Sequence, residues 1–326
     1  MSCSLVTIAV VPRERFSYSV RSLENIYAQT SHPFDLVYVD GGSPRAVRDQ
    51  LRNQADRRGF RLLRTEGYLT PNQARNMALP HATGRYVVFI DNDVLVEPGW
   101  LDELVTCAED TGASIVGPVY LSGPPGTRKI HMAAGIAHFE QQHGCRVLRV
   151  KHTLAGRELN AVADQLQRRP CELVEFHCML VRRTVFDDLG PLDENLMSAL
   201  EHEDLCLTVR ERGGAVYFEP AARVTYVPPP PLALSDYPFF MLRWSEAWNS
   251  PTLRHFQEKW QLQPDDHDLA VLADWLRRHR QLTVPLMWNA LHAVIGWRRA
   301  NTMERALNRI AVRLTNRRHA PSGLAH

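Results

Sequence analysis

The sequence predicts an α/β protein built on a mostly parallel sheet, because strand-like and helix-like segments alternate along its first 120 residues. Three runs rich in β-branched and aromatic residues are typical of strands buried on both faces: Leu5–Val11, Phe34–Val39 and Arg85–Ile90. The segments between the first strands, Ser19–Gln29 and 46–58, space their apolar residues three or four positions apart, as amphipathic helices do. This alternation indicates βαβ units with helices on both faces of the sheet.

The remaining elements of the sheet region follow from the same patterns. Further strands are predicted at 61–64, 114–120, 175–182, 216–218 and 223–227. Helices are predicted at 72–82, 184–189 and 203–212, the last ending at Gly213-Gly214. Residues 130–170 are polar and contain several histidines, and their pattern predicts no particular element.

Four consecutive prolines, Pro228–Pro231, mark the clearest boundary of the chain, because proline continues neither a helix nor a central strand. We therefore expect a sheet domain over 1–231, with halves of about 1–120 and 121–231. A helical, tryptophan-rich extension should follow over 232–326.

Charge is distributed unevenly along the chain, between an acidic body of residues 1–274 and a basic tail. The stretch Trp275–Arg318 holds ten arginines and one acid, a net charge of +9, which leaves −7 for the first 274 residues of a chain whose total is +2. An acidic body argues against a nucleic-acid-binding protein, whose basic surface should lie on the folded domain. The overall composition, 44% hydrophobic and 23% charged, excludes a disordered chain.

The six cysteines are scattered, without a CxxC pair or a zinc-type cluster, so neither a disulfide framework nor a zinc finger is expected. The first twelve residues lack the basic head of a signal peptide, and no apolar run reaches the length of a membrane span. These features predict a cytoplasmic protein.

Phosphate-loop, dinucleotide, zincin and serine-hydrolase motifs are absent, and the candidate functional residues are carboxylates where predicted strands end. Asp91-Asn92-Asp93 follows the strand 85–90. Two carboxylates two residues apart can hold Mg²⁺ or Mn²⁺ together with substrate phosphates, and we expect them to face solvent. The alternative is a turn in which Asp91 or Asn92 bonds its own backbone, but the long apolar strand before them favours the metal.

Two further residues support a nucleotide site. Asp40 ends a strand and precedes Gly41-Gly42, so its carboxylate could accept the imino N–H of a uracil-like base or simply cap a turn. Arg75, in a predicted helix, could face a diphosphate or could be a solvated surface arginine.

The acidic stretch Glu201-His202-Glu203-Asp204 stands before the amphipathic helix 203–212. Acids in a first helical turn commonly cap the helix, but a carboxylate there could also act as a general base at the rim of the sheet. His177 and His202 could contact an acceptor, although a structural role is commoner for each.

Taken in order, these motifs resemble the family 2 glycosyltransferases, whose GT-A fold is a Rossmann-like, mostly parallel sheet flanked by helices. The resemblance covers about residues 5–227 and extends weakly to 256–260. It implies a metal-dependent inverting transferase that moves a sugar from a nucleotide sugar, most simply a UDP-sugar, to a hydroxyl acceptor. The acceptor would be a carbohydrate, a lipid-linked molecule or another alcohol.

The resemblance also implies roles for individual residues. Asp91 and Asp93 would bind Mn²⁺ or Mg²⁺, and Asp204 would be the catalytic base. The nucleotide sugar would contact Pro12, Glu14, Asp40, Arg75, Asp91, Asn92 and Glu203.

Three positions depart from the family pattern. Gly41 stands where a second acid is usual, and Glu14 stands where an aromatic residue often stacks on the base, with Phe16 as a possible substitute. Tyr226 stands where many relatives have a histidine that binds the metal.

Two alternatives remain open from the sequence. One is a nucleotidyltransferase on the same fold, although its glycine-rich phosphate loop is missing from Pro12-Arg13-Glu14-Arg15. The other is a protein that binds nucleotide sugars without turnover, which the departures at Gly41 and Tyr226 would favour.

The arginines of the extension recur every four residues at Arg305, Arg309, Arg313 and Arg317, beside an apolar stripe of Leu307, Ile310, Ala311 and Leu314. Such basic amphipathic helices can lie on an anionic membrane surface or form a homodimer. Because the body is acidic, we expect instead that the stripe packs on the body and that the arginines pair with its carboxylates.

Overall fold

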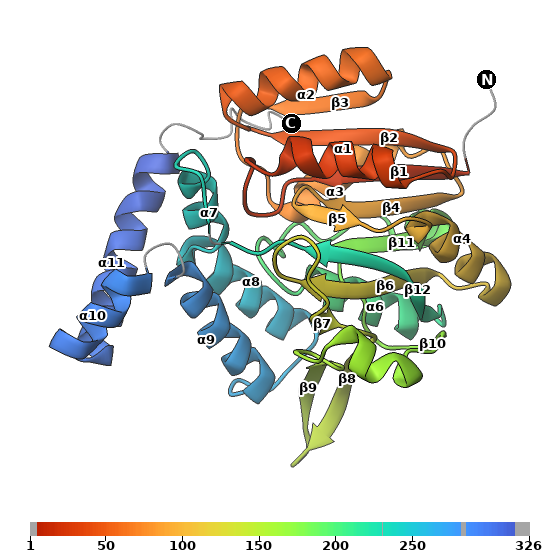
Figure 1. The fold of residues 1–326 in the computed structure, drawn as a ribbon. Helices are drawn as coiled ribbons and strands as arrows, with labels where there is room; N and C mark the ends of the chain where they lie inside the picture. Colours follow the sequence, from red (N-terminus) through yellow and green to blue (C-terminus); the bar gives the residue numbers. More distant parts are fainter. Residues whose placement is uncertain (1–4, 230, 282–284, 317–326) are drawn as a thin grey trace.

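The computed structural model describes residues 5–229, 231–281 and 285–316, and its core is a ten-stranded mixed sheet flanked by helices (Figure 1). The main path of the sheet runs β10-β12-β6-β11-β4-β1-β2-β3, with β5 paired to β12 and β7 paired to β6. The α/β class and the helical extension predicted from the sequence are confirmed.

Parallel strands form the N-terminal half of the sheet, as predicted. They are β1 (Val6–Val11), β2 (Phe34–Gly41), β3 (Arg61–Thr65) and β4 (Tyr86–Asp91). The helices between them are α1 (Ser19–Gln29), α2 (Arg45–Arg58), α3 (Pro71–Ala78) and the short 3₁₀ helix η1 (Leu79–His81). Because the strands are parallel, Pro12, Asp40 and Asp91 all lie at the same edge of the sheet, where β1, β2 and β4 end.

Mixed pairing builds the second half. The strands are β5 (Val94–Val96), β6 (Ile115–Ser122), β7 (Ile130–Met132), β10 (Arg169–Pro170), β11 (Cys178–Arg182) and β12 (Val216–Tyr226). The helices are α4 (Trp100–Thr111), α5 (Thr184–Leu189), α6 (Glu201–Glu211) and the 3₁₀ segment η2 (Leu159–Gln165). Two strands were predicted at 216–218 and 223–227, but they are one strand whose pairing with β6 shifts register between Phe218 and Arg223.

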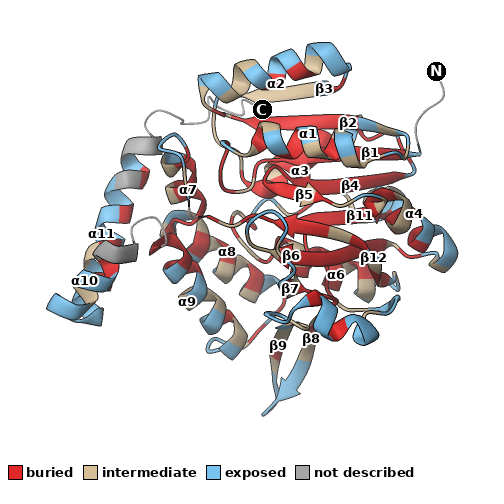
Figure 2. Cartoon of the chain, in the orientation of Figure 1, coloured by how far each residue is buried: buried red, intermediate tan, exposed pale blue. Residues whose placement is uncertain are grey.

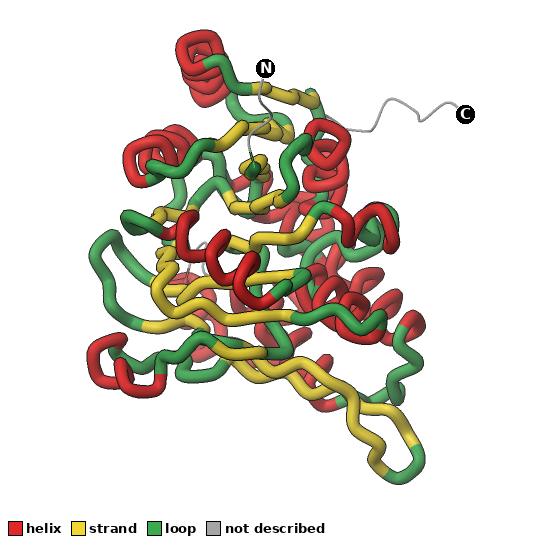
Figure 3. Tube along the Cα trace, turned by 90° about the vertical axis from the view of Figure 1, so that its right-hand side faces the viewer, coloured by secondary structure: helices red, strands yellow, loops and turns green. Residues whose placement is uncertain are grey.

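The histidine-containing stretch without a sequence prediction forms a hairpin of β8 (Gly135–Gln142) and β9 (Cys145–His152). This hairpin reaches beyond the body of the molecule (Figures 1 and 3). Its far end is exposed, whereas Val147 and Leu148 near its base are buried.

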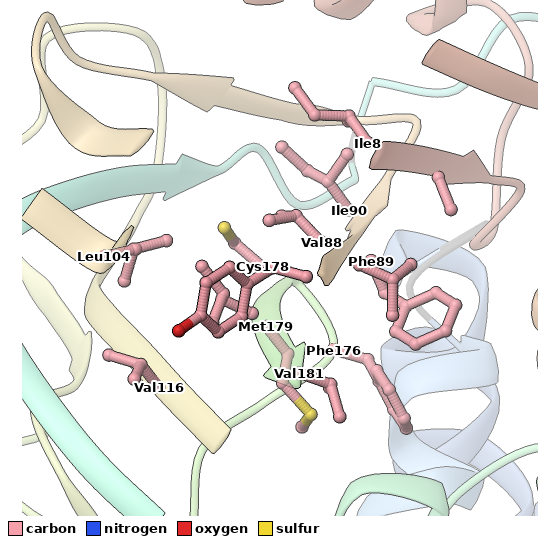
Figure 4. Close-up of a cluster of buried hydrophobic side chains, with 14 of the residues drawn as sticks. Ile8, Val88, Phe89, Ile90, Leu104, Val116, Phe176, Cys178, Met179 and Val181 are labelled. Atoms are coloured by element: carbon pink, nitrogen blue, oxygen red, sulfur yellow. The ribbon is translucent and has the colours of Figure 1, made fainter. Parts of the chain in front are cut away.

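The core lies on both faces of the central strands, which Figure 2 shows as almost entirely buried. Every residue of β1 and β4 is buried, as expected for strands covered by helices on both sides. In Figure 4, Val88 and Ile90 of β4 lie with Ile8 of β1 and Cys178 of β11, whereas Phe89 lies beside the ring of Phe176. This packing fixes the ends of the strands from which the polar residues of the site project.

The extension consists of α7 (Tyr237–Arg243), α8 (Glu246–Lys259), α9 (His267–Gln281), α10 (Pro285–Ile295) and α11 (Trp297–Asn316). It docks on the sheet domain chiefly through α7, α8 and α9. Asp236, just before α7, accepts hydrogen bonds from the backbone N–H groups of Phe16 and Ser17 at 2.9 and 3.0 Å. Thr252 of α8 accepts one from the backbone N–H of Met197 at 2.9 Å.

The prediction that the apolar stripe of the last helix packs on the body is wrong for the residues whose side chains are described. Leu307 and Ile310 of the apolar stripe are 48% and 54% exposed, while Glu304 and Asn308 on the opposite side are buried. Arg305, by contrast, pairs with Glu246, a carboxylate of the acidic first 274 residues, at 3.1 Å, as the charge distribution predicts. Arg317 and the side chains of Ala311 and Leu314 lie outside the described residues.

A polar contact explains this orientation of α11. Glu304 is 2% exposed and forms a two-bond ion pair with the buried guanidinium of Arg280 on α9, one bond measuring 2.7 Å. Burying the polar side satisfies this pair, so the apolar side faces outward. None of the helices in the described part of the chain is long and apolar enough to cross a membrane.

We predict that Glu304→Gln lowers the free energy of unfolding by about 3 kcal/mol, because it removes the nearer of two carboxylates that face the buried guanidinium of Arg280; the other, Glu246, lies 3.8 Å away. The matched control is Arg305→Gln, which removes an exposed arginine–carboxylate pair and should cost at most about 1 kcal/mol. Chemical denaturation of both variants makes the comparison. Equal losses in the two variants would mean that the buried pair does not hold α11 in place.

Candidate functional site

A cavity of about 670 Å³ opens between the sheet and the extension. The loop after β1, the segment before β11, the end of β12 and the start of α6 line it on the sheet side. The extension and the base of the hairpin close it. Its polar lining includes Arg13, His131, His152, Glu175, His177, Glu201, His202, Glu203, Tyr226, Arg243 and His279.

Beside this cavity, Asp91 and Asp93 lie in a compact group of charges. His177 Nδ1 lies 3.1 Å from Asp91 Oδ2, and the guanidinium groups of Arg13 and Arg75 lie 3.4 and 3.5 Å from the two oxygens of Asp91. The guanidinium of Arg15 lies 3.8 Å from Asp93. The structure thus brings Asp91 and Arg75 together, as the sequence analysis anticipated.

Both carboxylates are buried, so the expectation that they face solvent is wrong. Asp93 is 0% exposed, and burial raises its pKa to about 8, although the charge of Arg15 opposes this shift. Burial also acts on Asp91, but the hydrogen bond from His177 and the charge of Arg13 outweigh it and lower the pKa of that carboxyl. Burial and the charge of Arg13 lower the pKa of His177 to about 4, which leaves its ring neutral at pH 7.

Asn92 fixes the backbone of this region. Its amide oxygen accepts a bond from the backbone N–H of Arg13, and its nitrogen donates to the carbonyl of Arg15 and the hydroxyl of Ser19, at 2.8 to 3.0 Å. The side chain therefore holds the loop after β1 against the end of β4. Its contact with the donor stays a prediction.

Glu14 also makes structural contacts, and its contact with a nucleotide sugar stays a prediction. Its carboxylate is completely buried and accepts hydrogen bonds from Tyr226, Trp244 and His279, the last two at 2.8 and 3.0 Å. Glu14 thereby links the loop after β1 to the last strand and to the extension. Tyr226, which departs from the family pattern, thus donates its hydroxyl hydrogen bond to Glu14.

The two side chains predicted to recognise the base, Asp40 and Phe16, make contacts within the protein. Asp40 accepts bonds from the backbone N–H and the hydroxyl of Ser43, both at 2.9 Å, and pairs with Arg64, so it caps the turn. The ring of Phe16 packs on Phe239 of α7 at 4.8 Å between centroids.

Pro12 and Gly41 meet at this turn. A Cβ on Gly41 would lie 3.2 Å from the Pro12 ring. The turn therefore leaves little room for the acidic side chain that is usual at this position in the family.

The acidic stretch at the start of α6 divides between two environments. Among the described residues, Glu201, His202 and Glu203 line the cavity, whereas Asp204 does not. Asp204 accepts bonds from Lys259 at 2.8 Å and from the indole N–H of Trp260 at 2.9 Å. The sequence analysis expected Asp204 at the rim of the sheet, but α8 covers it.

Glu203 and His202 form an ion pair on the cavity wall, 3.2 Å apart. Burial would lower the pKa of His202, but the carboxylates of Glu203 and Glu175 outweigh it and raise that pKa to about 9. Burial likewise favours the protonated form of Glu203, but the charge of His202 prevails and lowers its pKa. At pH 7 the pair is therefore a carboxylate beside an imidazolium.

A group of histidines around Glu175 was missed by the sequence analysis. His131 lies at β7, His152 ends β9, and both rings approach the buried carboxylate of Glu175. The strand-like spacing of Glu175 and His177, which places them on one side of the chain, was the only local signal. The approach of His131 and His152 depends on the hairpin, which no pattern predicted.

The residues of the Asp91 and Asp93 group fit a divalent cation. Asp91 Oδ1 and both carboxylate oxygens of Asp93 are buried and, within the described chain, accept no hydrogen bond. Unbonded carboxylate oxygens are the ligands that Mg²⁺ and Mn²⁺ prefer.

The sequence model of the family described as "Glycosyl transferase family 2" matches residues 7–190, more than half of the chain. The chain is 28% identical over 216 residues to uncharacterized protein y4gI of Sinorhizobium fredii, covering 64% of this chain and 23% of that protein. It is 29% identical over 156 residues to the pre-mycofactocin glycosyltransferase of Mycobacterium tuberculosis, covering 48% and 30% respectively. The chain thus spans less than a third of the length of these relatives.

Solved structures with the same fold include the mannosyltransferase PcManGT from Pyrobaculum calidifontis, in complex with GDP-Man and Mn²⁺. Its TM-score is 0.54 at 17% identity, and the match covers 97% of this chain and 88% of that chain. GalNAc-T7 with UDP, GalNAc and Mn²⁺ gives a TM-score of 0.54 at 14% identity, covering 86% and 55%. At these identities the likeness concerns the fold, which is the GT-A fold expected from the sequence.

Proposed function

This chain belongs to glycosyl transferase family 2, and from that premise we propose that it transfers a sugar from a nucleotide sugar to a hydroxyl acceptor. The observation that carries the proposal is the group of Asp91, Asp93 and three arginines where β1 and β4 end. We propose a UDP-sugar as the donor, a divalent cation as cofactor and inversion at the anomeric carbon. We also propose two domains, 1–231 and 232–326, that enclose one cavity. Arg243, Trp244 and His279 of the second domain line this cavity together with residues of the first.

The arginines suit the diphosphate of the donor. Arg13, Arg15 and Arg75 lie within 3.4 to 3.8 Å of the carboxylates of Asp91 and Asp93, and each carries a planar, permanently charged group. Such groups bind phosphate oxygens through two parallel hydrogen bonds. Arg13 reaches the cavity itself and is the arginine best placed to meet the donor first.

The unbonded oxygens of Asp91 and Asp93 support the metal part of the proposal. They would hold Mn²⁺ or Mg²⁺, and the bound cation would stabilise the negative charge that develops on the departing nucleoside diphosphate. Arg15 and Arg75 would hold the two carboxylates in place, and the bound cation would favour the ionised form of Asp93. The neutral ring of His177 would orient Asp91 from the cavity side.

We propose Glu203 as the general base in place of Asp204. Its carboxylate lies on the cavity wall, and its buried Oε2 faces the ring of His202 at 3.2 Å. It would take the proton of the acceptor hydroxyl, which then attacks the anomeric carbon opposite the leaving diphosphate and inverts its configuration. His202 would hold the carboxylate ionised until that step.

A binding protein without turnover is the second candidate. Tyr226 favours it, because this residue stands where many relatives have a metal-binding histidine and its hydroxyl bonds Glu14.

Release of nucleoside diphosphate from UDP-sugars and GDP-sugars, with Mn²⁺ and with chelator, separates the candidates. We expect release that requires Mn²⁺, whereas a binding protein would retain the donor intact. A nucleotidyltransferase would instead form pyrophosphate from a nucleoside triphosphate.

We predict that Asp93→Asn abolishes Mn²⁺-dependent transfer without lowering the melting temperature at pH 7. Burial raises the pKa of Asp93 to about 8. The ionised side chain therefore destabilises the folded state at any pH above the usual carboxyl pKa, and an uncharged amide removes this destabilisation. The control is Asp187→Asn at the surface of α5. Full activity of Asp93→Asn in the presence of chelator would contradict the metal assignment.

A second pair of variants tests the base. Glu203→Gln should lower kcat by about 10²–10⁴-fold at unchanged donor affinity, because an amide accepts no proton at neutral pH. Asp204→Asn should keep most of the turnover, since its bonds to Lys259 and Trp260 lie outside the cavity. The reverse pattern of rates would return the role of base to Asp204.

A further inference from the structure

The group around Glu175 has the composition of a metal site. His131 Nε2 and His152 Nε2 lie 3.2 and 3.6 Å from Glu175 Oε1. One ligand atom from each of the three residues can be chosen so that all lie within 4.8 Å of one another. The three side chains come from β7, from the end of β9 and from the segment before β11, and all of them line the cavity.

Two imidazoles and one carboxylate form a recurring ligand set for first-row transition metals that keep open positions for a reactant. With metal–ligand bonds of about 2.0–2.2 Å, neighbouring ligand atoms around a metal lie about 3–3.5 Å apart. The distances from Glu175 Oε1 already fall close to this range. Small side-chain movements would therefore complete the geometry.

Glu175 provides an independent observation. The residue is 4% exposed, and its Oε2 is buried with no hydrogen-bond partner among residues 5–229, 231–281 and 285–316. A buried carboxylate oxygen without a donor is costly unless a cation or a ligand occupies the place it faces. His177 Nε2, at 3.9 Å from that oxygen, is too far away for a hydrogen bond.

The backbone around Glu175 is held firmly, which makes the site preorganised. The Glu175 backbone N–H donates to the hydroxyl of Tyr120, and that hydroxyl bonds the carbonyls of Glu175 and Cys178, all at 2.9 Å. Gly117 makes this possible, because a Cβ there would lie 2.7 Å from the Tyr120 oxygen and 2.4 Å from Val174.

We propose that His131, His152 and Glu175 bind a divalent transition metal such as Zn²⁺ or Co²⁺, at a site separate from Asp91 and Asp93. The ligand types differ: the second site offers nitrogen as well as oxygen, whereas Asp91 and Asp93 offer oxygen alone. His177 stands between the two sites, with Nδ1 toward Asp91 and Nε2 toward Glu175. The proposal concerns metal binding and does not depend on the glycosyl-transfer reaction.

Titration of the chelator-treated full chain, produced without an affinity tag, with Co²⁺ and Zn²⁺ tests this site. The wild-type protein should develop the visible absorption of protein-bound Co²⁺ with nitrogen ligands, and Zn²⁺ should displace it. His152→Ala and Glu175→Gln should each weaken binding by at least about tenfold. The control His138→Ala removes a histidine of β8 that bonds Glu172, at 2.7 Å, and should bind as the wild type does.

Asp93→Asn separates this site from the proposed cofactor site and should leave the Co²⁺ spectrum unchanged. Circular dichroism and melting curves without metal show whether each variant is folded, and His131→Gln provides a milder second variant. The proposal is overturned if the wild type shows no Co²⁺ absorption. It is also overturned if binding survives in folded His152→Ala and His131→Gln, or if it is lost in Asp93→Asn.

Discussion

The pairing of buried carboxylates with buried guanidinium groups, where β1 and β4 end, is the constraint on which the rest of this structure depends. Three carboxylates (Glu14, Asp91 and Asp93) and three guanidinium groups (Arg13, Arg15 and Arg75) gather where β1 and β4 end, and all but Arg13 are nearly inaccessible. An ionised group left without a partner there would cost several kcal/mol. The loop after β1, the end of β4, α3 and the extension must therefore keep their relative positions.

The extension is part of the site for the same reason. Glu14 is satisfied by Trp244 and His279, and Arg243 pairs with Glu201 at 3.2 Å on the cavity wall. The four prolines mark where the sheet ends. They do not mark where the site ends, because residues on both sides of them enclose the cavity. An arrangement of this kind couples the stability of the extension to the shape of the cavity.

The sequence predicted what depends on neighbours along the chain. The parallel strands, their intervening helices and the shared edge where Asp40 and Asp91 lie follow from hydrophobic periodicity and from the rule that strand ends share an edge. Local patterns could not predict partners far away: Glu14 meets His279 across 265 positions, and Asp204 meets Lys259 across 55. The order of motifs along the sequence therefore predicted Asp204 as the catalytic base, but in the structure its carboxylate bonds Lys259 and Trp260 at the end of α8. The histidines around Glu175 depend in the same way on a hairpin whose polar sequence carries no clear strand signal.

The central claim is that the buried charge group is the diphosphate and cation site of a nucleotide-sugar enzyme. Calorimetric titration of the full chain with UDP, in Mn²⁺ and in chelator, tests it most directly, with Arg75→Gln as the variant that removes one guanidinium group proposed to contact the diphosphate. The account predicts binding in Mn²⁺ that becomes much weaker in chelator and in Arg75→Gln. Equal affinity in all three conditions, or no binding of UDP in Mn²⁺, would contradict it.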